Sequence, residues 1–353
     1  MLCGCNSDSN DNENEIRIVS QFTNLCNNGE LYSDSGKAVF FDFISMVSSP
    51  LCARPNCTHT DAEVCSAYNM GICPFIYNDK IYYFMHDIFV DKDGTFREKS
   101  DIYVADLDGT NRQAVKTIYD MRLADISPMC IIGNELYVSA ISHTFSEYGG
   151  YGDEQACEAY LCKYNFDTNT FTSIKSFGMN YSVGLYFYGV YNNCIYMTHS
   201  YKTESTVFTF ETTTSNSQDT FIRENIKFDL ETFEISQSDL SEIHAITNGW
   251  CIMGDENETV FLNEDGRQII SEESVYDFIY IVNDIAFVEY YGYCIDLSDG
   301  KKYAVVKPEN PDQRYTVKDY IGEKYIVAIT DYEKGSKNYA AFTKNELIKE
   351  EIK

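Results

Sequence analysis

Short runs of apolar, β-forming residues recur along this chain, and each run follows a pair of residues that favours a tight turn. The pair contains Asn, Gly or Asp, which tolerate a positive φ angle, and the run that follows is usually rich in aromatic residues. This phrase begins at seven places, namely Asn28, Asn78, Gly133, Asn192, Asn248, Asn283 and Gly322. Each copy therefore predicts a hairpin that joins two strands.

Repeats of this size, built from strands, are typical of an all-β fold, the β-propeller, with one four-stranded sheet in each repeat. We predict seven four-stranded blades in a single domain over residues 15–353, with a last hairpin from Tyr339 to the C-terminus completing the seventh blade. A six- or eight-bladed ring follows if the first or the fifth repeat is divided differently. Strand cysteines such as Cys130, Cys194 and Cys251 are expected to be small buried hydrophobes.

Composition supports a large core and restricts the partners. Hydrophobic residues make up 44% of the chain, and aromatic residues make up 15%. The net charge of −28 gives a surface that repels nucleic acid phosphates and anionic lipid headgroups, which excludes both as direct partners. It suits cationic ligands, metal ions or simply solubility.

The N-terminal residues resemble a lipoprotein signal. The run Leu2-Cys3-Gly4-Cys5 resembles the bacterial lipobox, in which the last Cys, here Cys5, is lipidated. The polar, acidic stretch from Asn6 to Glu15 is typical of a flexible tether, so we assign residues 1–14 to the anchor and tether. We expect a monomer anchored to the outer face of the cytoplasmic membrane, which it contacts through the lipid alone. The alternative is a chance match, because Met1 stands where an apolar signal should end.

One short segment is dense in metal-ligating side chains. Cys52, Cys57, His59 and Cys65 form a Cys3His set, which suits a tetrahedral, structural Zn²⁺. Their spacing is not that of a standard zinc finger. If Cys73 is included the number of cysteines is even, which suits two disulfides instead. Free thiols are the third alternative.

The same segment carries a family resemblance. The run from Pro50 to Tyr68, followed by Asn78-Asp79-Lys80-Ile81, resembles uncharacterised TolB-like β-propeller lipoproteins of anaerobic Gram-positive gut bacteria. The resemblance implies a propeller fold and a location outside the cytoplasmic membrane. It implies no reaction.

Long connections follow the second strand of the second, third and fourth repeats, over 87–100, 144–158 and 200–220. We expect them to share one face with the Cys/His segment and to form a binding surface. Tyr148 and Tyr151 are candidate ligand contacts there. The candidate histidines His86, His143 and His199 each follow a second strand, and isolated, solvated histidines are the alternative interpretation.

We therefore predict a binding module for a glycan, a peptide or a cell-envelope protein. The sequence contains no Gly-x-Ser-x-Gly, His-Glu-x-x-His or P-loop motif, which disfavours an enzyme. The alternative is a carbohydrate-active lyase or hydrolase with a site over the central channel, which needs converging acids and bases. A purely structural scaffold would bind no small ligand.

Overall fold

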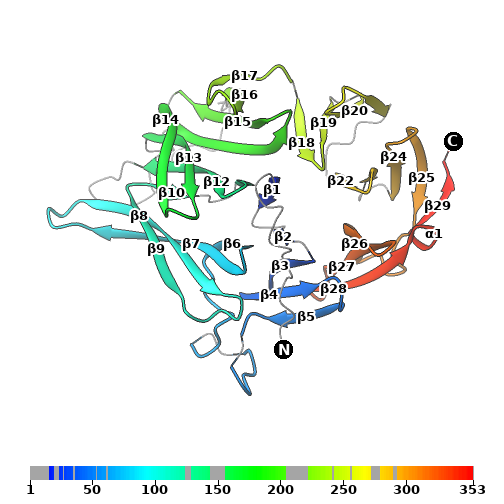
Figure 1. The fold of residues 1–353 in the computed structure, drawn as a ribbon, viewed down its shortest axis with the longest axis horizontal. Helices are drawn as coiled ribbons and strands as arrows, with labels where there is room; N and C mark the ends of the chain where they lie inside the picture. Colours follow the sequence, from blue (N-terminus) through cyan, green and yellow to red (C-terminus); the bar gives the residue numbers. More distant parts are fainter. Residues whose placement is uncertain are drawn as a thin grey trace, which may run out of the picture.

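The computed structural model shows strands arranged around a ring (Figure 1). It describes residues 16–19, 24–26, 28–34, 36–52, 54–60, 63–123, 129–143, 156–203, 222–240, 242–254, 257–271, 279–288 and 292–352. Cys5, Tyr148 and Tyr151 lie outside these described residues, as do residues 1–14 and most of the connections 144–158 and 200–220. No helix in the described part of the chain is long and apolar enough to cross a membrane.

The described strands form six hydrogen-bonded antiparallel sheets, in which neighbouring strands are consecutive in the chain except where β1 pairs with β11, β10 with β12 and β29 with β25. The first two sheets have four strands each and comprise β2 (Asn24–Cys26), β3 (Gly29–Asp34), β4 (Lys37–Asp42), β5 (Val47–Pro50), and then β6 (Ile72–Tyr77), β7 (Lys80–Val90), β8 (Phe96–Asp106) and β9 (Gln113–Tyr119). This up-and-down order is that of propeller blades.

The next sheet has nine strands and contains two repeats. Its strands are β1 (Ile16–Val19), β10 (Arg122–Leu123), β11 (Met129–Ile132), β12 (Glu135–His143), β13 (Ala156–Asn165), β14 (Thr170–Tyr191), β15 (Cys194–Lys202), β16 (Ile222–Asp229) and β17 (Ile235–Gln237). The first half of β14 pairs with β13 and the second half pairs with β15. This one strand of 22 residues therefore joins the third and fourth repeats.

Three smaller sheets complete the ring (Figure 1). They comprise β18 (Ile243–Thr247), β19 (Trp250–Gly254), β20 (Thr259–Asn263) and β21 (Gln268–Ser271); β22 (Ile279–Val282), β23 (Ile285–Val288), β24 (Tyr293–Asp296), β25 (Lys301–Val305) and β29 (Ile348–Glu351); and β26 (Gln313–Ile321), β27 (Lys324–Asp331) and β28 (Ser336–Thr343). A single short helix in the described chain, α1 (Lys344–Leu347), links β28 to β29.

The turn chemistry explains why the repeats fold into hairpins. Both residues of five predicted turn pairs have positive φ, for example 46° at Asn78 and 56° at Asp79. The other four pairs are 192–193, 248–249, 283–284 and 322–323. These are the two-residue turns whose twist matches the flanking strands. The hairpin prediction is confirmed, and so is the all-β propeller class; the number of seven blades stays a prediction.

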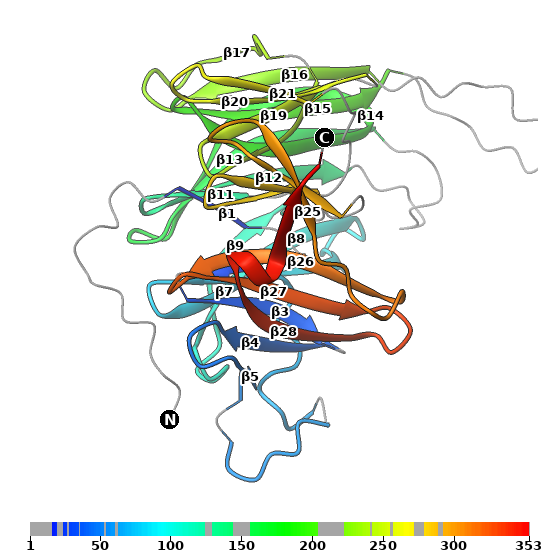
Figure 2. The ribbon, with the colours of Figure 1, turned by 90° about the vertical axis from the view of Figure 1, so that its right-hand side faces the viewer.

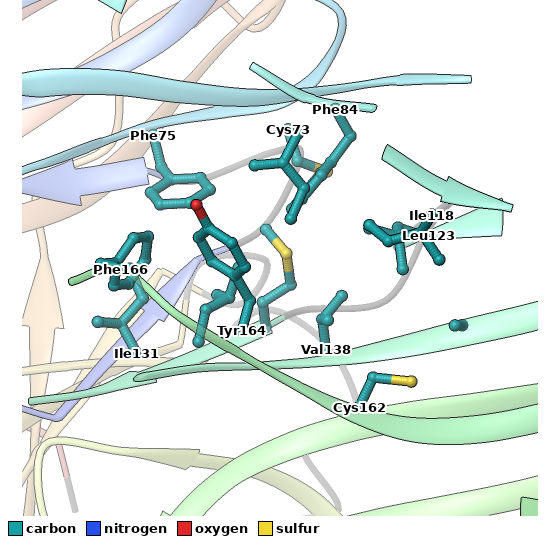
Figure 3. Close-up of a cluster of buried hydrophobic side chains, with 14 residues drawn as sticks. Cys73, Phe75, Phe84, Ile118, Leu123, Ile131, Val138, Cys162, Tyr164 and Phe166 are labelled. Carbon is teal, nitrogen blue, oxygen red and sulfur yellow. The ribbon is translucent and has the colours of Figure 1, made fainter. Parts of the chain in front are cut away.

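Neighbouring sheets pack through aromatic and aliphatic side chains. Figure 3 shows such a cluster between the β6–β9 sheet and the nine-stranded sheet, where Phe75 and Phe84 face Tyr164 and Phe166. The ring of Tyr77 stacks on Phe166 with centroids 3.9 Å apart. The predicted burial of strand cysteines is confirmed, since Cys130 and Cys251 are 0% exposed.

Side chains, rather than a shared sheet, join the first and last sheets. The ring of Phe41 on β4 stacks on Tyr339 of β28 with centroids 3.7 Å apart. The final hairpin predicted from Tyr339 onward is wrong, because β29 pairs with β25 and not with β28. Beyond Thr343 the chain turns through α1, whose Leu347 is fully buried and draws the chain toward β25.

Candidate metal centre and ligand pocket

The four predicted metal ligands come together. The Sγ atoms of Cys52, Cys57 and Cys65 and a ring nitrogen of His59 all lie within 4.8 Å of one another. His59 Nδ1 is 3.4 Å from Cys65 Sγ. In a tetrahedral zinc site, bonds of about 2.0–2.3 Å separate the ligand atoms by roughly 3.5–3.8 Å, so small side-chain rotations would complete the site. The residues therefore fit a metal of this kind.

No disulfide links the cysteines in the described part of the chain. The fourth cysteine of the disulfide hypothesis, Cys73, is 2% exposed and packs in the hydrophobic cluster of Figure 3 with Phe75 and Phe84. It lies on β6 rather than in the loop, which leaves three cysteines and one histidine as the set.

The loop backbone is bent so that its side chains face each other. Asn56 and His59 have φ angles of 60° and 55°, in the left-handed region. The Tyr68 hydroxyl donates to the His59 carbonyl at 3.2 Å. The Cys57 N–H donates to the Arg54 carbonyl at 3.2 Å. These contacts fix the loop before any metal is bound.

A hairpin of the second sheet supports the loop from outside. The Arg112 guanidinium donates to the Tyr68 carbonyl at 2.8 Å, and the Ser66 hydroxyl donates to the Asp108 carbonyl at 3.0 Å. Gly109 allows this approach, because a Cβ there would lie 2.4 Å from the Leu51 carbonyl oxygen. The loop is therefore anchored between β5 and the β8–β9 hairpin.

The thiols differ in acidity. Burial alone would raise the pKa of the Cys52 thiol, but hydrogen bonds from the Ser66 side chain and from the backbone at Arg54 and Ser66 lower it to about 6. Burial and the neighbouring Cys52 and Cys57 raise the pKa of Cys65. The thiolate is the form that binds a metal, so Cys52 is prepared as the first ligand.

The loop lies at the rim of the ring. Figures 1 and 2 draw the segment from Leu51 to Tyr68 projecting outward beyond β5, across the ring from the labelled β14 and β15. The predicted long connection over 87–100 is wrong in its length, because β7 and β8 pair from Asp87 with Lys99 to Val90 with Phe96 and leave only a short turn over 91–95.

Two of the predicted histidines converge on a carboxylate that the sequence did not reveal. Glu98 on β8 has a side chain that is 1% exposed. Its Oε1 accepts from the backbone N–H of His143 at 2.8 Å, and His143 Nδ1 lies 3.1 Å from both carboxylate oxygens. His86 Nε2 lies 3.9 Å from Oε2. This group fastens β7 and β8 to the end of β12.

The third histidine belongs to a different environment. His199 on β15 is 3% exposed, and its ring stacks on Tyr201 with centroids 4.7 Å apart. Its Nδ1 lies 3.6 Å from Glu224. Burial lowers the pKa of His199 and outweighs the opposite effect of that carboxylate. The isolated, solvated alternative is therefore wrong for His199, which is packed and neutral at pH 7.

A pocket that the sequence analysis did not anticipate lies between the β22–β25 sheet and β26. Its cavity volume is about 360 Å³. Its walls include the aromatic side chains of Tyr280, Phe287, Tyr293 and Tyr315. Among the described residues that line it, Glu309 is the only carboxylate and none is a histidine. No motif marks these residues, which come from strands of two adjacent repeats and from the connection between β25 and β26.

Comparisons with known proteins add no family. No protein-family model and no curated protein matches the chain. Among solved structures, an oligogalacturonate lyase in complex with manganese is 10% identical over 93% of this chain and 90% of that chain, with a TM-score of 0.48. A prolyl endopeptidase is 10% identical over 93% of this chain and 47% of that chain, with a TM-score of 0.45.

A third similar structure is the propeller domain of the Trilobed protease from Pyrococcus furiosus, 12% identical over 79% of this chain and 93% of that chain, with a TM-score of 0.30. The chain spans about half the length of the prolyl endopeptidase. At these identities the likeness concerns the fold alone. The protein is a β-propeller by its own sheet order, and its ligand must be argued from its own residues.

Proposed function

We propose that this chain is a β-propeller binding module that acts outside the cytoplasmic membrane. The observation that carries the proposal is the pocket beside β26, whose lining is aromatic and aliphatic with a few polar groups at its edge. Preformed concave sites of this composition are typical of small-ligand binding. Tyrosines supply both a flat apolar face and a hydroxyl, which suits recognition.

The arrangement of acids and bases favours binding over catalysis. Hydrolysis or elimination at a sugar generally uses a pair of groups within hydrogen-bond reach of one substrate. The part of the pocket lining that the structure describes offers one carboxylate, Glu309, and no histidine. The Glu98–His143 pair has suitable chemistry, but the Glu98 side chain is 1% exposed and is held between strands.

The proposed location rests on the sequence. The lipobox-like run ending at Cys5, the polar tether and the TolB-like resemblance support a monomeric lipoprotein on the outer face of the cytoplasmic membrane. A glycan, a peptide or a cell-envelope protein is the partner class available there. Tyr148 and Tyr151 stay candidate contacts for a large partner. Expression with a full signal sequence in a Gram-positive host should give lipid-modified, membrane-bound protein, and Cys5→Ala should give released protein.

The binding proposal is tested with a glycan array, a peptide library and a turnover assay on the same purified protein. We expect saturable binding to members of one class and no change in the mass of any bound oligosaccharide or peptide. Products of cleavage or elimination would instead establish the lyase or hydrolase alternative. Absence of both binding and turnover would favour the scaffold.

We further propose that Cys52, Cys57, His59 and Cys65 hold a structural Zn²⁺. The geometry supports four ligands, which leaves no open position for a substrate. The lowered pKa of the ligand Cys52 and the anchored loop both support tight binding of the metal. The metal would stabilise the connection over 51–71 between β5 and β6, since closed zinc sites contribute directly to folding.

Native mass spectrometry of protein purified without oxygen or chelator tests the metal. We expect the mass of one Zn²⁺ per chain, a loss of at least about tenfold in zinc affinity in Cys57→Ser, and a lower Tm for that variant. Cys251→Ser is the matched control, because Cys251 is buried in a different sheet and should retain the zinc. A metal-free chain that is lighter by about two hydrogens for each bridge would establish disulfides instead.

A further inference from the structure

We propose that the pocket between the β22–β25 sheet and β26 binds a hydrophobic carboxylate, a ligand with an aromatic or branched aliphatic body and an anionic end. This rests on the proposed function as a binding module and names the class of ligand. The shared chemistry has two sources, a small free carboxylate or the C-terminus of a peptide.

The deepest walls are apolar. Phe287, Val288 and Val317 are 3%, 1% and 4% exposed, and all three line the cavity. Tyr280, Tyr315 and Val305 line it as partly buried groups. A ligand that reaches these walls gains by removing apolar surface from water. Sugar hydroxyls against the same walls would lose hydrogen bonds to water, so the walls favour an apolar body over a sugar ring.

The pocket is surrounded by positive charge in a chain that is strongly negative overall. Lys307 and Arg314 line it, and Glu309 is the one carboxylate among the described lining residues. Two further ammonium groups lie near its tyrosines, with Lys302 Nζ 5.4 Å from the ring centroid of Tyr293. The second, Lys318 Nζ, is 5.8 Å from the ring centroid of Tyr280 and also pairs with Glu30 at 3.2 Å.

This charge arrangement selects the sign of the ligand. A quaternary ammonium binds to the faces of tyrosine rings, but here lysine cations already lie over two of the rings, which makes a second cation unfavourable. An anion gains instead from Arg314 and Lys307, and an arginine can donate two parallel hydrogen bonds to a carboxylate. The chain as a whole carries a net charge of −28, so the positive charge at the pocket is opposite in sign to that of the protein.

The loop at the mouth is held in place before a ligand arrives. Between β25 and β26 the chain passes through Pro308 and Pro311, and Asn310 Oδ1 accepts from the Asp312 N–H at 3.0 Å. The Lys307 side chain lies over Gly292, where an added Cβ would be 2.1 Å from Cε. A cationic group and a rigid turn are thus placed beside the apolar walls, which lowers the entropy lost on binding.

The test is titration calorimetry of the full chain with matched probes at low ionic strength. The probes are N-acetylphenylalanine, its uncharged amide, and a pentapeptide that ends in a free phenylalanine carboxylate. We expect the acid to bind at least about tenfold more tightly than the amide. Arg314→Gln and Lys307→Gln should weaken the acid and leave the amide unchanged. Tyr315→Ala should weaken both, and Lys92→Gln, in the exposed 91–95 turn, should change neither.

Several outcomes would overturn the inference. Equal affinity for acid and amide would remove the role of the cations, and tighter binding of tetramethylammonium would reverse the sign of the ligand. Unchanged binding in Tyr315→Ala would place the site elsewhere. Binding of the pentapeptide as tightly as the small acid supports the proposal and assigns a peptide C-terminus; binding of the small acid alone supports it and assigns a free metabolite.

Failure of this inference is separable from failure of the proposed function. If no carboxylate probe binds but the array finds a glycan or an internal peptide, the binding module stands and the ligand class is wrong. If the protein turns over an oligosaccharide or a peptide, the proposed function itself is wrong. Thermal unfolding of each variant without ligand confirms that the fold is intact before its affinity is compared.

Discussion

At the scale of single residues, a buried carboxylate joins the two ends of the propeller ring. Glu30 on β3 is 0% exposed and accepts hydrogen bonds from Lys337 Nζ and from the Tyr339 hydroxyl, each at 2.8 Å. Lys318 Nζ lies 3.2 Å away. Burial alone would raise the pKa of Glu30, but the two ammonium groups outweigh it and hold the pKa below its usual value. The carboxylate is therefore ionised in the folded chain.

Replacing this carboxylate by an amide should destabilise the closed ring. Glu30→Gln keeps the shape but leaves Lys318 and Lys337 buried without their anion, and breaking such a group typically costs about 3–5 kcal/mol. Urea unfolding at pH 7 measures the loss. Glu351→Gln is the matched control, because its pair with Lys301 is half exposed and screened by solvent, so its loss should change stability far less. Equal effects of the two substitutions would contradict the role of Glu30.

The same residue should give stability a defined dependence on pH. Because the pKa of Glu30 is lower when folded than its usual 4.5, the unfolded chain takes up the proton first as pH falls. Its contribution is complete above about pH 5.5 and is lost progressively through and below pH 4.5, down to the folded pKa. The free energy of unfolding of Glu30→Gln should therefore fall less steeply than that of the parent between pH 6 and pH 4. Parallel curves would show that Glu30 is not coupled to folding.

Buried carboxylates show where sequence reasoning ends at this scale. Glu30 and Glu98 are two of 55 acidic residues, and nothing near them in the sequence marks them as buried. Glu98 meets His143 across 45 positions, and Glu30 meets Lys337 across 307. The Cys/His set was visible because its members are near each other in the sequence. The two buried carboxylates could not be recognised in the sequence, because their partners are distant in the chain and are brought to them only when the sheets pack.

At the scale of elements, the turn pairs were predictable and the ends of the repeats were not. Asn, Asp and Gly in a two-residue turn impose a backbone conformation by themselves, so the hairpins follow from local chemistry. The turn pairs lie within the repeats, so they do not mark where one repeat ends and the next begins. In the structure β14 runs through both the third and the fourth repeat, with register shifts near Gly184 and Gly189. The partner of the last strand, β29, was predicted wrongly, because β29 pairs with β25 of the preceding sheet and not with its neighbour in the sequence, β28.

The C-terminal strand should be important for stability although it completes no blade of its own. Leu347 at the end of α1 is 0% exposed, and the segment after it pairs with β25. Leu347→Ala should cost about 2–5 kcal/mol by leaving a cavity. Lys349→Ala, an exposed neighbour on β29, should cost less than about 0.5 kcal/mol. Denaturant unfolding distinguishes them, and a neutral Leu347→Ala would show that the segment is not packed.

At the scale of the whole molecule, the period of the sequence was enough to predict the architecture but not the binding site. A propeller follows from the repeat, because each repeat must bury its faces against two neighbours. The pocket depends on how β22–β25 and β26 are spaced around the ring, and its tyrosines resemble the many others that pack between sheets. The four metal ligands could be predicted because they lie in one loop of the sequence. The pocket could not, because it forms only when two repeats and the connection between them are folded together.

The excess of negative charge should make the stability of the whole fold depend on salt. With 55 acidic and 27 basic residues, the folded chain concentrates charge that the unfolded chain spreads out. The screening length falls from about 30 Å at 0.01 M salt to about 8 Å at 0.15 M. Screening of repulsion should therefore raise Tm as NaCl is added over this range, by a few degrees if the gain is on the order of 1–2 kcal/mol. Choline chloride should give the same rise, since screening depends on ionic strength and not on a bound sodium ion. A fall in Tm with either salt would mean that ion pairs at the surface outweigh the repulsion, and that the acidic residues are arranged for stability rather than merely tolerated.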